Sequence, residues 1–330
     1  MRRFFFARRL ARAVPKLKLT PHGLRILARR VAAIDRGRAE LVYAAVEFRL
    51  SRRRRIKRLS SISVPPAAVE PFTRAWRHRE LIRAVARREF ISRFRGSALG
   101  PAWAVLSPLI MMLTYTTMFS VTVPQLAGGQ DLMEYAANNL LGLIAFSFFS
   151  ELAYRAPMLL HEHVNFVKKS IFPSETIAWT STIRAGTYAL VAFGVFLVFR
   201  LATGGDLPWT IVLTPLIFAP YVLLTLGIVW FLMALGAFTR DVAHVMASIV
   251  PILMFATPVF YTMGQVPGQY RWIFYLNPLA DYISMLRDVA LHGRLPNVFG
   301  YIAVSALSYA VFVFGHQFFM RYKSVIVDVI

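Results

Sequence analysis

Long apolar stretches without charged side chains limit the fold of this chain more than any other feature. The two clearest stretches are Pro101 to Val123 and Pro208 to Phe238, and neither of them contains a charged residue. About 20 helical residues, at about 1.5 Å each, cross the roughly 30 Å hydrocarbon core of a bilayer. Hydrophobic residues make up 57% of the chain and are concentrated in such stretches. The sequence therefore predicts an all-α integral membrane protein.

Six transmembrane helices are predicted. They cover residues 101–123, 136–160, 182–199, 208–238, 242–261 and 298–319, within a membrane domain of residues 101–330. Glu151 and Arg155 in the second span are four residues apart, so we expect them to neutralise each other. Arg184 and Arg200, at opposite ends of the third span, are expected to snorkel to the membrane surfaces.

The segment between the fifth and sixth spans, residues 262–297, is apolar but too short and too charged to cross the membrane twice. Asn277 and Pro278 suit the N-cap and the first position of a helix. We therefore predict one or two short re-entrant or interfacial helices in this segment.

Positive charge is concentrated before the first span. Residues 1–100 hold 27 of the 38 lysines and arginines and 6 of the 16 acidic residues, so nearly all of the net charge of +22 lies there. A basic block ahead of membrane spans favours a cytoplasmic segment facing anionic lipid over a nucleic-acid partner. We divide this block into a basic cytoplasmic extension, residues 1–70, and an amphipathic interfacial helix, residues 71–100.

Basic residues in the connecting loops predict the orientation. Lys168 and Lys169 place the second loop inside, Arg240 places the fourth loop inside, and the 124–135 loop has no basic residue. Both termini are therefore expected in the cytoplasm. Three arginines of the segment before the last span oppose this orientation: Arg271, Arg287 and Arg294.

Several motifs follow one another along residues 75–330. The first is "RREFISRFRGSALGPAWAVLSPL", with Arg93, Arg95, Ser97, Leu99, Gly100, Trp103, Pro108 and Leu109, and the others are "NFVKKSIFPSE", "FTRDVAHV", "TPVFY" and "YLNPLADYISMLRDVAL". This series resembles the permease subunit of ABC transporters that export polysaccharides such as O-antigen and teichoic acid. Phe94 precedes Arg95 here, whereas the aromatic residue of the family pattern follows the second basic residue. Residues 1–70 lie outside the resemblance.

The resemblance implies a homodimeric membrane subunit that works with two copies of a separate ATPase. Its substrate would be an undecaprenyl-linked polysaccharide exported across the bacterial inner membrane. ATP and Mg would bind the partner, because this chain has no G-x-x-x-x-G-K-[ST] motif. We expect no cofactor, catalytic residue or metal in this chain. His161 and His163, two residues apart, would point to different faces of a helix.

Arginines ahead of the first span form the predicted site for the lipid headgroup, because guanidinium groups bind phosphate in two-point geometry. They are Arg87, Arg88, Arg93 and Arg95. The Gly100-Pro101 pair beside them breaks the helix and lets the interfacial segment turn into the span. Anchoring to bulk lipid would explain the same arginines.

Two further sets of residues complete the predicted site. Aromatic rings of the first and fifth spans are predicted to stack on sugars in a channel. The alternative is that they face lipid. They are Trp103, Tyr115, Phe119, Phe255, Phe260 and Tyr261. The resemblance places a coupling helix for the ATPase at Asn165, Lys168, Lys169, Phe172 and Pro173, where a membrane-surface loop is the alternative. Arg240 and Asp241 would form a second contact or cap a helix.

Two other classes of protein remain open from the residues alone. A polytopic membrane glycosyltransferase would need grouped acidic residues, and the external candidates show no paired spacing: Asp131, Glu134, Asp206, Asp281 and Asp288. An ATP-independent flippase of lipid-linked sugars would favour an internal inverted repeat and more polar residues within the spans. The sequence shows neither feature.

Overall fold

The computed structural model describes residues 69–122, 131–164 and 173–330. The chain divides into two compact units, residues 1–65 and 66–330, and all of the described residues belong to the second. The predicted basic extension, residues 1–70, therefore lies almost wholly outside the described residues. Within the described ranges the secondary structure is helical, without a β-strand, so the predicted all-α class is confirmed.

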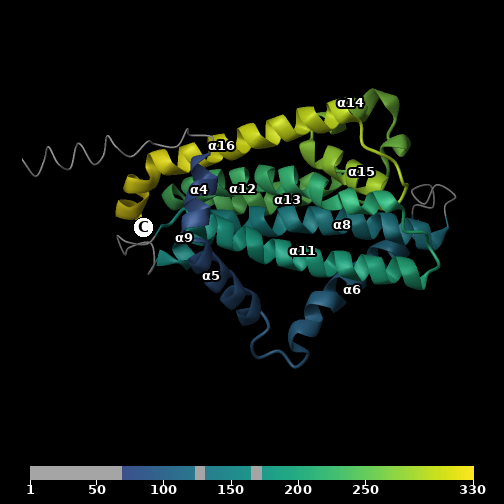
Figure 1. Cartoon of the computed structure of the whole chain (residues 1–330), viewed down its shortest axis with the longest axis horizontal. Coiled ribbons are helices and arrows are strands. Elements are labelled where there is room, and N and C mark those ends of the chain that lie inside the picture. The colour runs from purple at the N-terminus through teal and green to yellow at the C-terminus, as the bar shows by residue number, and fades with distance from the viewer. Residues whose placement is uncertain (1–68, 123–130, 165–172) are drawn as a thin grey trace, which may run out of the picture. The chain divides into compact units, whose positions relative to one another are not determined.

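Helices make up most of the described residues (Figure 1). In chain order the α-helices are α4 (Glu70–Arg77), α5 (Arg79–Ser92), α6 (Trp103–Thr122), α8 (Leu132–Arg155), α9 (Leu159–Glu162), α11 (Thr176–Ala202), α12 (Thr214–Phe238), α13 (Asp241–Phe255), α14 (Arg271–Tyr275), α15 (Pro278–Ala290) and α16 (Val298–Val329). Short 3₁₀ helices join several of them: η2 (Gly100–Ala102), η3 (Ala156–Met158), η4 (Trp209–Leu213), η5 (Met263–Gln265) and η6 (Gly268–Tyr270).

Five helical segments of the described residues are long and apolar enough to cross a membrane, judged by length and composition. They are Gly100–Phe119, Leu132–Glu162, Thr176–Ala202, Trp209–Phe238 and Val298–Ile326. These segments match five of the six predicted spans, so the chain is a multi-pass membrane protein.

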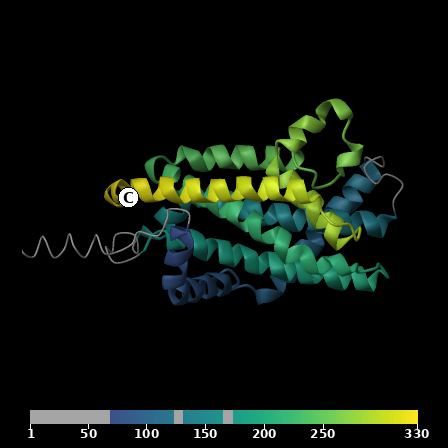
Figure 2. The same ribbon diagram turned by 45° about the horizontal axis from the view of Figure 1, so that its top comes forward.

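The predicted fifth span, residues 242–261, is only partly helical. Helix α13 has 15 residues and ends at Phe255, which gives it a length of about 22 Å, less than the bilayer core. Pro258 lacks the amide hydrogen that would continue the helix. The chain instead forms turns that lead into η5, η6 and α14, and Figure 2 shows this part projecting at one end of the bundle.

Helices α8 and α12 form the buried centre, whereas α6 is mostly exposed. Helix α16 packs along α12, and the two approach closely where Gly227 faces Gly315. A Cβ atom on Gly315 would overlap the backbone carbonyl of Gly227. Between the same helices the rings of Trp230 and Phe312 pack with their centres 5.4 Å apart. Small residues and large rings thus alternate along this contact.

The predicted amphipathic segment, residues 71–100, is two helices and a turn instead of one helix. Helices α4 and α5 are separated at His78, and α5 ends at Ser92. One side of the pair packs against the bundle, since the Phe72 ring lies 4.9 Å from that of Phe312 and Ile82 is buried. The other side is open, with Trp76 70% exposed. Figure 1 shows α5 and α6 meeting in a V below the bundle.

Two of the arginines that opposed the predicted orientation bind backbone within the protein. Arg287 is 4% exposed. Its five hydrogen bonds go to the backbone carbonyls of Asn138, Pro258, Val259 and Tyr261. Arg271 donates to the carbonyls of Val266 and Gly264. Neither residue is a free loop charge of the kind that predicts orientation.

Arg200, at the end of α11, does not snorkel, so that prediction is wrong. It is 8% exposed. Its Nη1 donates to Glu134 Oε2 at 2.5 Å, and its Nε donates to the carbonyl of Asp206 at 3.2 Å. The carboxylate on the neighbouring helix α8 is close enough to keep the guanidinium inside the protein.

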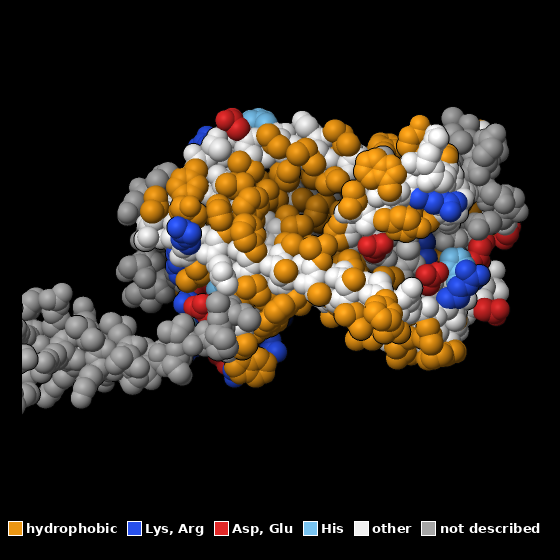
Figure 3. Space-filling view, turned by 90° about the horizontal axis from the view of Figure 1, so that it is seen from above, with side chains coloured by type: hydrophobic (Ala, Val, Ile, Leu, Met, Phe, Trp, Pro, Cys, Tyr) orange, Lys and Arg blue, Asp and Glu red, His pale blue; other side chains and the backbone are white. Residues whose placement is uncertain are grey.

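Hydrophobic side chains cover the middle of the face seen in Figure 3, while charged side chains gather towards its two ends. Several of the exposed apolar residues belong to α16: Val298, Phe299, Ile302, Leu307 and Phe314. An apolar band between charged ends is the surface that a bilayer requires.

Candidate functional site

The chain turns sharply between α5 and α6. Gly96 and Gly100 have φ angles of +80° and +51°, which favour glycine because a Cβ atom clashes in this region. Pro101 follows in η2, and α6 starts at Trp103. The break predicted at Gly100-Pro101 is therefore present, and α6 returns to pack against α8 and α11.

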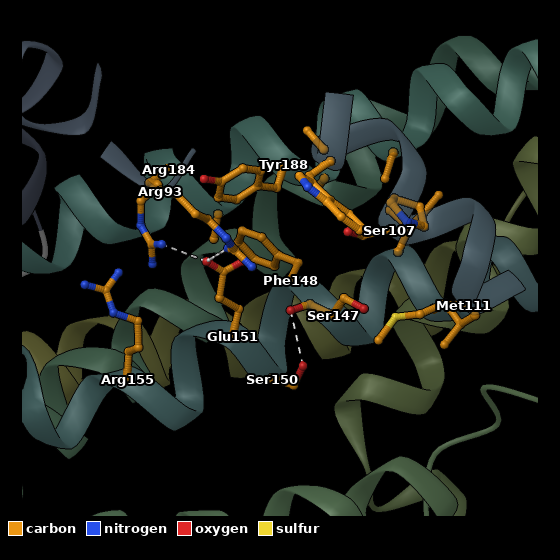
Figure 4. Close-up of a pocket in the computed structure, with 18 of the residues that line it drawn as sticks. Arg93, Ser107, Met111, Ser147, Phe148, Ser150, Glu151, Arg155, Arg184 and Tyr188 are labelled. Atoms are coloured by element: carbon orange, nitrogen blue, oxygen red, sulfur yellow. Dashed lines mark hydrogen bonds and ion pairs between the residues drawn. The ribbon is translucent and has the colours of Figure 1, made fainter. Parts of the chain in front are cut away.

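A pocket of about 760 Å³ lies behind this turn, between α5, α6, α8 and α11 (Figure 4). Along α8 its lining passes from Arg155 and Glu151 to Leu140, and along α11 from Arg184 to Ala192. One end of the pocket is therefore charged and the other apolar. The apolar part of the lining comprises Pro108, Met111, Leu140, Leu143, Ile144, Ala185, Ala189 and Ala192.

Glu151 of α8 joins two arginines at the charged end. Its Oε1 lies 3.1 Å from Arg93 Nη1 and 2.9 Å from Arg184 Nη1, and Figure 4 shows both guanidinium groups converging on this carboxylate. The Arg93 guanidinium also lies 4.7 Å from the centre of the Tyr188 ring, close enough for a cation–π contact. Arg93 thus connects the turn after α5 to both α8 and α11.

Glu89 of α5 is the second carboxylate of the pocket. Its Oε1 lies 3.0 Å from His163 Nε2, and its Oε2 lies 3.3 Å from Arg184 Nε and 3.8 Å from Arg155 Nη1. Arg155 also pairs with Glu162. The predicted pairing of Glu151 with Arg155 is therefore wrong, because α5, α9 and α11 supply nearer partners for both.

The Glu89–His163 pair perturbs the pKa of both groups. Burial raises the pKa of Glu89, but the hydrogen bond with His163 and the charges of His163, Arg155 and Arg184 outweigh it, so the pKa is lowered overall. The same hydrogen bond raises the pKa of His163. Its Nδ1 lies 2.9 Å from the carbonyl of Leu159. Both ring nitrogens face oxygen acceptors, which the protonated imidazolium satisfies.

Arg184 is buried in ion pairs with Glu89 and Glu151 and does not snorkel, so that prediction is wrong. It is 5% exposed and lies well inside α11, because this helix begins at Thr176, earlier than the predicted span. Its Nε forms an ion pair with Glu89 Oε2 at 3.3 Å, and its Nη2 has no hydrogen-bond partner among the described residues. Arg184 is thus a buried cation on the wall of the pocket.

A second buried carboxylate fastens α4 to the bundle. Glu175, just before α11, lies 2.9 Å from Arg74 of α4 and 2.5 Å from Lys323 of α16. Trp230 of α12 donates to the Glu175 carbonyl at 3.1 Å. Burial raises the pKa of the Glu175 carboxyl, but the hydrogen bonds and charges of Lys323 and Arg74 lower it overall. Four helices therefore meet at this residue.

The structure brings one of the four predicted headgroup arginines to the pocket. Arg93 belongs to the lining. Arg87, Arg88 and Arg95 are exposed and do not line it. Binding of a lipid headgroup by any of them stays a prediction.

The predicted channel aromatics fall into separate groups. Tyr115 and Phe119 each lie 4.7 Å from the ring of Phe260, and Phe255 lies 6.4 Å from it. Trp103 lines the pocket, and Tyr261 packs against Phe274. Phe260 is only 1% exposed, so it supports the neighbouring rings. Stacking on sugars stays a prediction for the others.

Most of the predicted coupling residues lie outside the described residues: Asn165, Lys168, Lys169 and Phe172. Pro173 is half-buried, and its carbonyl accepts a hydrogen bond from Thr176 at 2.7 Å. Arg240 is the N-cap of α13 and is exposed. Asp241 is also exposed and accepts from Thr239 Oγ1 at 3.0 Å. The N-cap of α13 makes no side-chain capping hydrogen bond, so both alternatives stay predictions, and both charged side chains are accessible.

Two of the acidic residues considered for a glycosyltransferase lie close to basic side chains. Glu134 pairs with Arg200, and Asp288 lies 3.9 Å from His292. Burial raises the pKa of Asp281 to about 6. Among the described residues there is no group of three or more histidines and carboxylates that could hold a metal ion.

Sequence reasoning missed Glu89, Glu151, Arg184 and His163 as a connected set. Two signals were available in the sequence. Glu89 is an acidic residue inside a strongly basic segment, and Arg184 is a charge within residues 176–199, which are otherwise uncharged. The spacing of these residues along the chain does not reveal that they meet, because four different helical segments bring them together.

Comparisons with known proteins place the pocket within a known family. The family model for the ABC-2 type transporter matches residues 80–291. The O-antigen export system permease protein RfbA of Myxococcus xanthus is 24% identical over 235 residues, which cover 71% of this chain and 88% of that protein.

Two further relatives have similar coverage. An O-antigen export system permease protein RfbA of Klebsiella pneumoniae is 25% identical over 218 residues, 66% of this chain and 82% of the relative. The polysialic acid transport protein KpsM of Escherichia coli is 23% identical over 220 residues, 65% of this chain and 82% of the relative. Because the family match covers well over half of the sequence and includes the α5–α6 turn and the pocket, this chain belongs to the ABC-2 type transporter family.

Proposed function

We propose that this chain is the membrane subunit of an ATP-driven exporter of lipid-linked polysaccharide in the bacterial inner membrane. The observation that carries the proposal is the pocket at the α5–α6 turn, charged at one end and apolar at the other. It lies within residues 80–291, which match the ABC-2 type transporter family model, and the chain is similar to an O-antigen export permease and to a polysialic acid transport protein. A substrate with an anionic group on a lipid chain matches both ends of it.

The working transporter in this proposal contains two copies of the chain and two copies of a partner ATPase, which binds ATP and Mg. Helix α13 would complete a six-span arrangement with both termini in the cytoplasm. Residues 165–173 and the exposed pair Arg240 and Asp241 would contact the ATPase. The substrate would be an undecaprenyl-linked glycan, with its headgroup admitted past α5 and its sugars passed along exposed aromatic rings.

The decisive experiment uses a strain in which the gene is deleted and the chain is supplied again. We expect the deletion to abolish surface glycan while finished lipid-linked glycan accumulates inside the cell. Accumulation separates export from synthesis, because loss of a glycosyltransferase would leave the glycan unfinished. An unaltered amount of surface glycan would contradict the proposal.

The role of the arginines in export is tested with a double variant. Arg93→Lys together with Arg95→Lys keeps the charge that anchors the segment to lipid, but removes the two-point geometry that guanidinium offers to phosphate. We expect normal protein in the membrane and reduced surface glycan. Full export by this variant would assign the arginines to anchoring alone.

A further inference from the structure

Ion pairs to helices α4 and α5 lie on both sides of the segment that is proposed to contact the ATPase. Residues 165–172 are outside the described residues, but His163 precedes them and Glu175 follows them. Nε2 of His163 lies 3.0 Å from Oε1 of Glu89 on α5. Oε1 of Glu175 lies 2.9 Å from Nη1 of Arg74 on α4. Figure 1 shows α4, α5 and α9 at the same end of the bundle. Both ends of the segment are therefore connected to these two helices.

The carboxylates of both ion pairs are shielded from solvent. The Glu175 side chain is 4% exposed, and the side chains of Glu89 and His163 are each 14% exposed. Salt and water weaken such pairs less than they weaken pairs on the open surface. The two contacts can therefore hold α4 and α5 in a fixed relation to the residues that flank the segment.

Few side chains of α4 and α5 are buried in the bundle. Pro71 is the buried residue of α4, and Ile82 and Ala86 are those of α5. The ring of Phe72 adds a contact with Phe312. An element with few buried apolar contacts can shift relative to the core at a low cost in free energy. Because the ion pairs are a large part of their attachment, α4 and α5 are expected to follow a displacement of the residues with which they pair.

A shift of α5 would also reach the pocket. Oε2 of Glu89 lies 3.3 Å from Nε of Arg184 on α11. Arg93, directly after the end of α5, lies 3.1 Å from Glu151 on α8. Movement of α5 therefore alters ion pairs at the charged end of the pocket. Direct contacts thus connect the residues beside the segment to the pocket wall.

We propose that Arg74 and His163 are positioning residues that transmit an ATP-driven movement of residues 165–173 to helices α4 and α5. Through Glu89 and Arg93, α5 then changes the charged end of the pocket. This role rests on the proposed function, because the ATPase has to contact residues 165–173. It assigns the residues that carry the movement and the helices that receive it.

The variants break the two contacts and leave Glu175 and Glu89 each with a cation. Arg74→Gln removes one contact, and Glu175 keeps Lys323 at 2.5 Å. His163→Leu removes the other, and Glu89 keeps its arginine on α11. The double variant is therefore expected to fold. Lys323→Gln is the matched control, because it takes a different cation from Glu175 and belongs to α16.

The first measurement is hydrogen–deuterium exchange of the full-length chain in complex with its ATPase, without nucleotide and with a non-hydrolysable ATP analogue and Mg²⁺. In the parent, the analogue should change exchange in residues 165–173 and in α4 and α5. In the double variant, the change in residues 165–173 should persist, while the change in α4 and α5 should shrink about fivefold or more, as expected for loss of an ordinary coupling. Lys323→Gln should behave like the parent.

The second measurement compares surface glycan in cells with ATP hydrolysis by the purified complex. We expect the double variant to keep its ATP hydrolysis and to lose surface glycan about fivefold or more. A merely structural role would lower the amount of protein in the membrane, and ATP hydrolysis and export would then fall together. Each single variant should show a partial loss, which keeps the test decisive if the double variant does not fold.

Transmission by these contacts is overturned if the analogue changes α4 and α5 equally in parent and double variant, or in neither. An equal loss in Lys323→Gln, or a parallel fall of ATP hydrolysis and export, overturns it as well. A change confined to residues 165–173 of the parent would leave the proposed function standing. A chain that binds no ATPase, or whose deletion leaves surface glycan unaltered, would refute the proposed function itself.

Discussion

At the scale of single residues, buried arginines are held in two ways. Arg184 and Arg200 pair with carboxylates of α8 and α5. Arg287 is held by backbone carbonyls alone among its hydrogen-bond partners, and burial lowers its pKa to about 10, so it stays charged at neutral pH. Its contacts connect α15 to α8 and to the turn after α13, where regular helix bonding ends.

We predict that Arg287→Gln destabilises the fold by about 3 kcal/mol or more, because several buried carbonyls lose their donor at once. The measurement is thermal unfolding of the purified protein in detergent. Arg271→Gln is the matched control, since Arg271 binds two loop carbonyls at a partly exposed position. An equal loss of stability in the two variants would contradict a special role for Arg287.

The Glu89–His163 contact predicts a pH dependence. The pKa of His163 is raised from 6.5, so its contribution is complete below about pH 6.5 and is lost as the pH rises through the raised value. The pKa of Glu89 is lowered from 4.5, so its contribution is complete above about pH 4.5 and is lost as the pH falls through the lowered value. The contact is therefore strongest between these limits.

We expect His163→Gln to lower the unfolding temperature more near pH 5.5 than near pH 8.5, because His163 of the parent loses its proton as the pH rises through its raised pKa. Thermal scans of parent and variant at the two pH values give the comparison. His244→Gln, at an exposed position on α13, should show no such difference. A pH-independent effect of His163→Gln would mean that the contact is held by packing alone.

At the scale of helices, the sequence was sufficient where the signal was local. The uncharged runs that start at Pro101 and Pro208 correspond to helices, and the Gly100-Pro101 break lies where it was predicted. The fifth span was predicted too long, since its apolar residues continue to Tyr261 although α13 ends at Phe255. Hydropathy reports burial in lipid or protein equally, so it cannot distinguish an apolar helix from an apolar turn packed inside the fold.

The close contact of α12 with α16 gives a prediction at this scale. Gly315→Ala places a Cβ atom against the backbone of Gly227, which cannot move without shifting a helix. We expect a loss of about 1–3 kcal/mol in stability. Gly194→Ala on α11 meets nothing within 4 Å and should be neutral or stabilising, because alanine favours a helix over glycine by about 1 kcal/mol. Chemical or thermal unfolding of both variants provides the measurement, and equal behaviour would argue against tight α12–α16 packing.

At the scale of the whole molecule, the family was predictable from ordered motifs, whereas the pocket was not. Each motif is a short consecutive segment within residues 75–330, so it can be recognised directly in the sequence. The pocket depends on Glu89, Glu151 and Arg184, which are separated by 62 and 33 positions in the sequence and meet only after four helices have packed. Of the predicted headgroup residues, Arg93 reaches the pocket, because it follows directly after the end of α5.

We predict that the purified chain alone hydrolyses no ATP, because its sequence has no phosphate-binding loop. Phosphate release by the chain alone, and by the chain with its partner ATPase, measures this directly. A partner variant without its Walker lysine is the control for contaminating activity. ATP hydrolysis that persists after all partners have been removed would contradict the proposal that only the partner ATPase hydrolyses ATP.

The contacts of Arg287 also bear on how the protein is made. Its acceptors belong to Asn138, Pro258, Val259 and Tyr261, and all of them precede Arg287 in the sequence. The ribosome therefore finishes every acceptor before it adds the arginine. During synthesis the cation emerges towards carbonyls that already exist, and the last membrane span, α16, leaves the ribosome only afterwards.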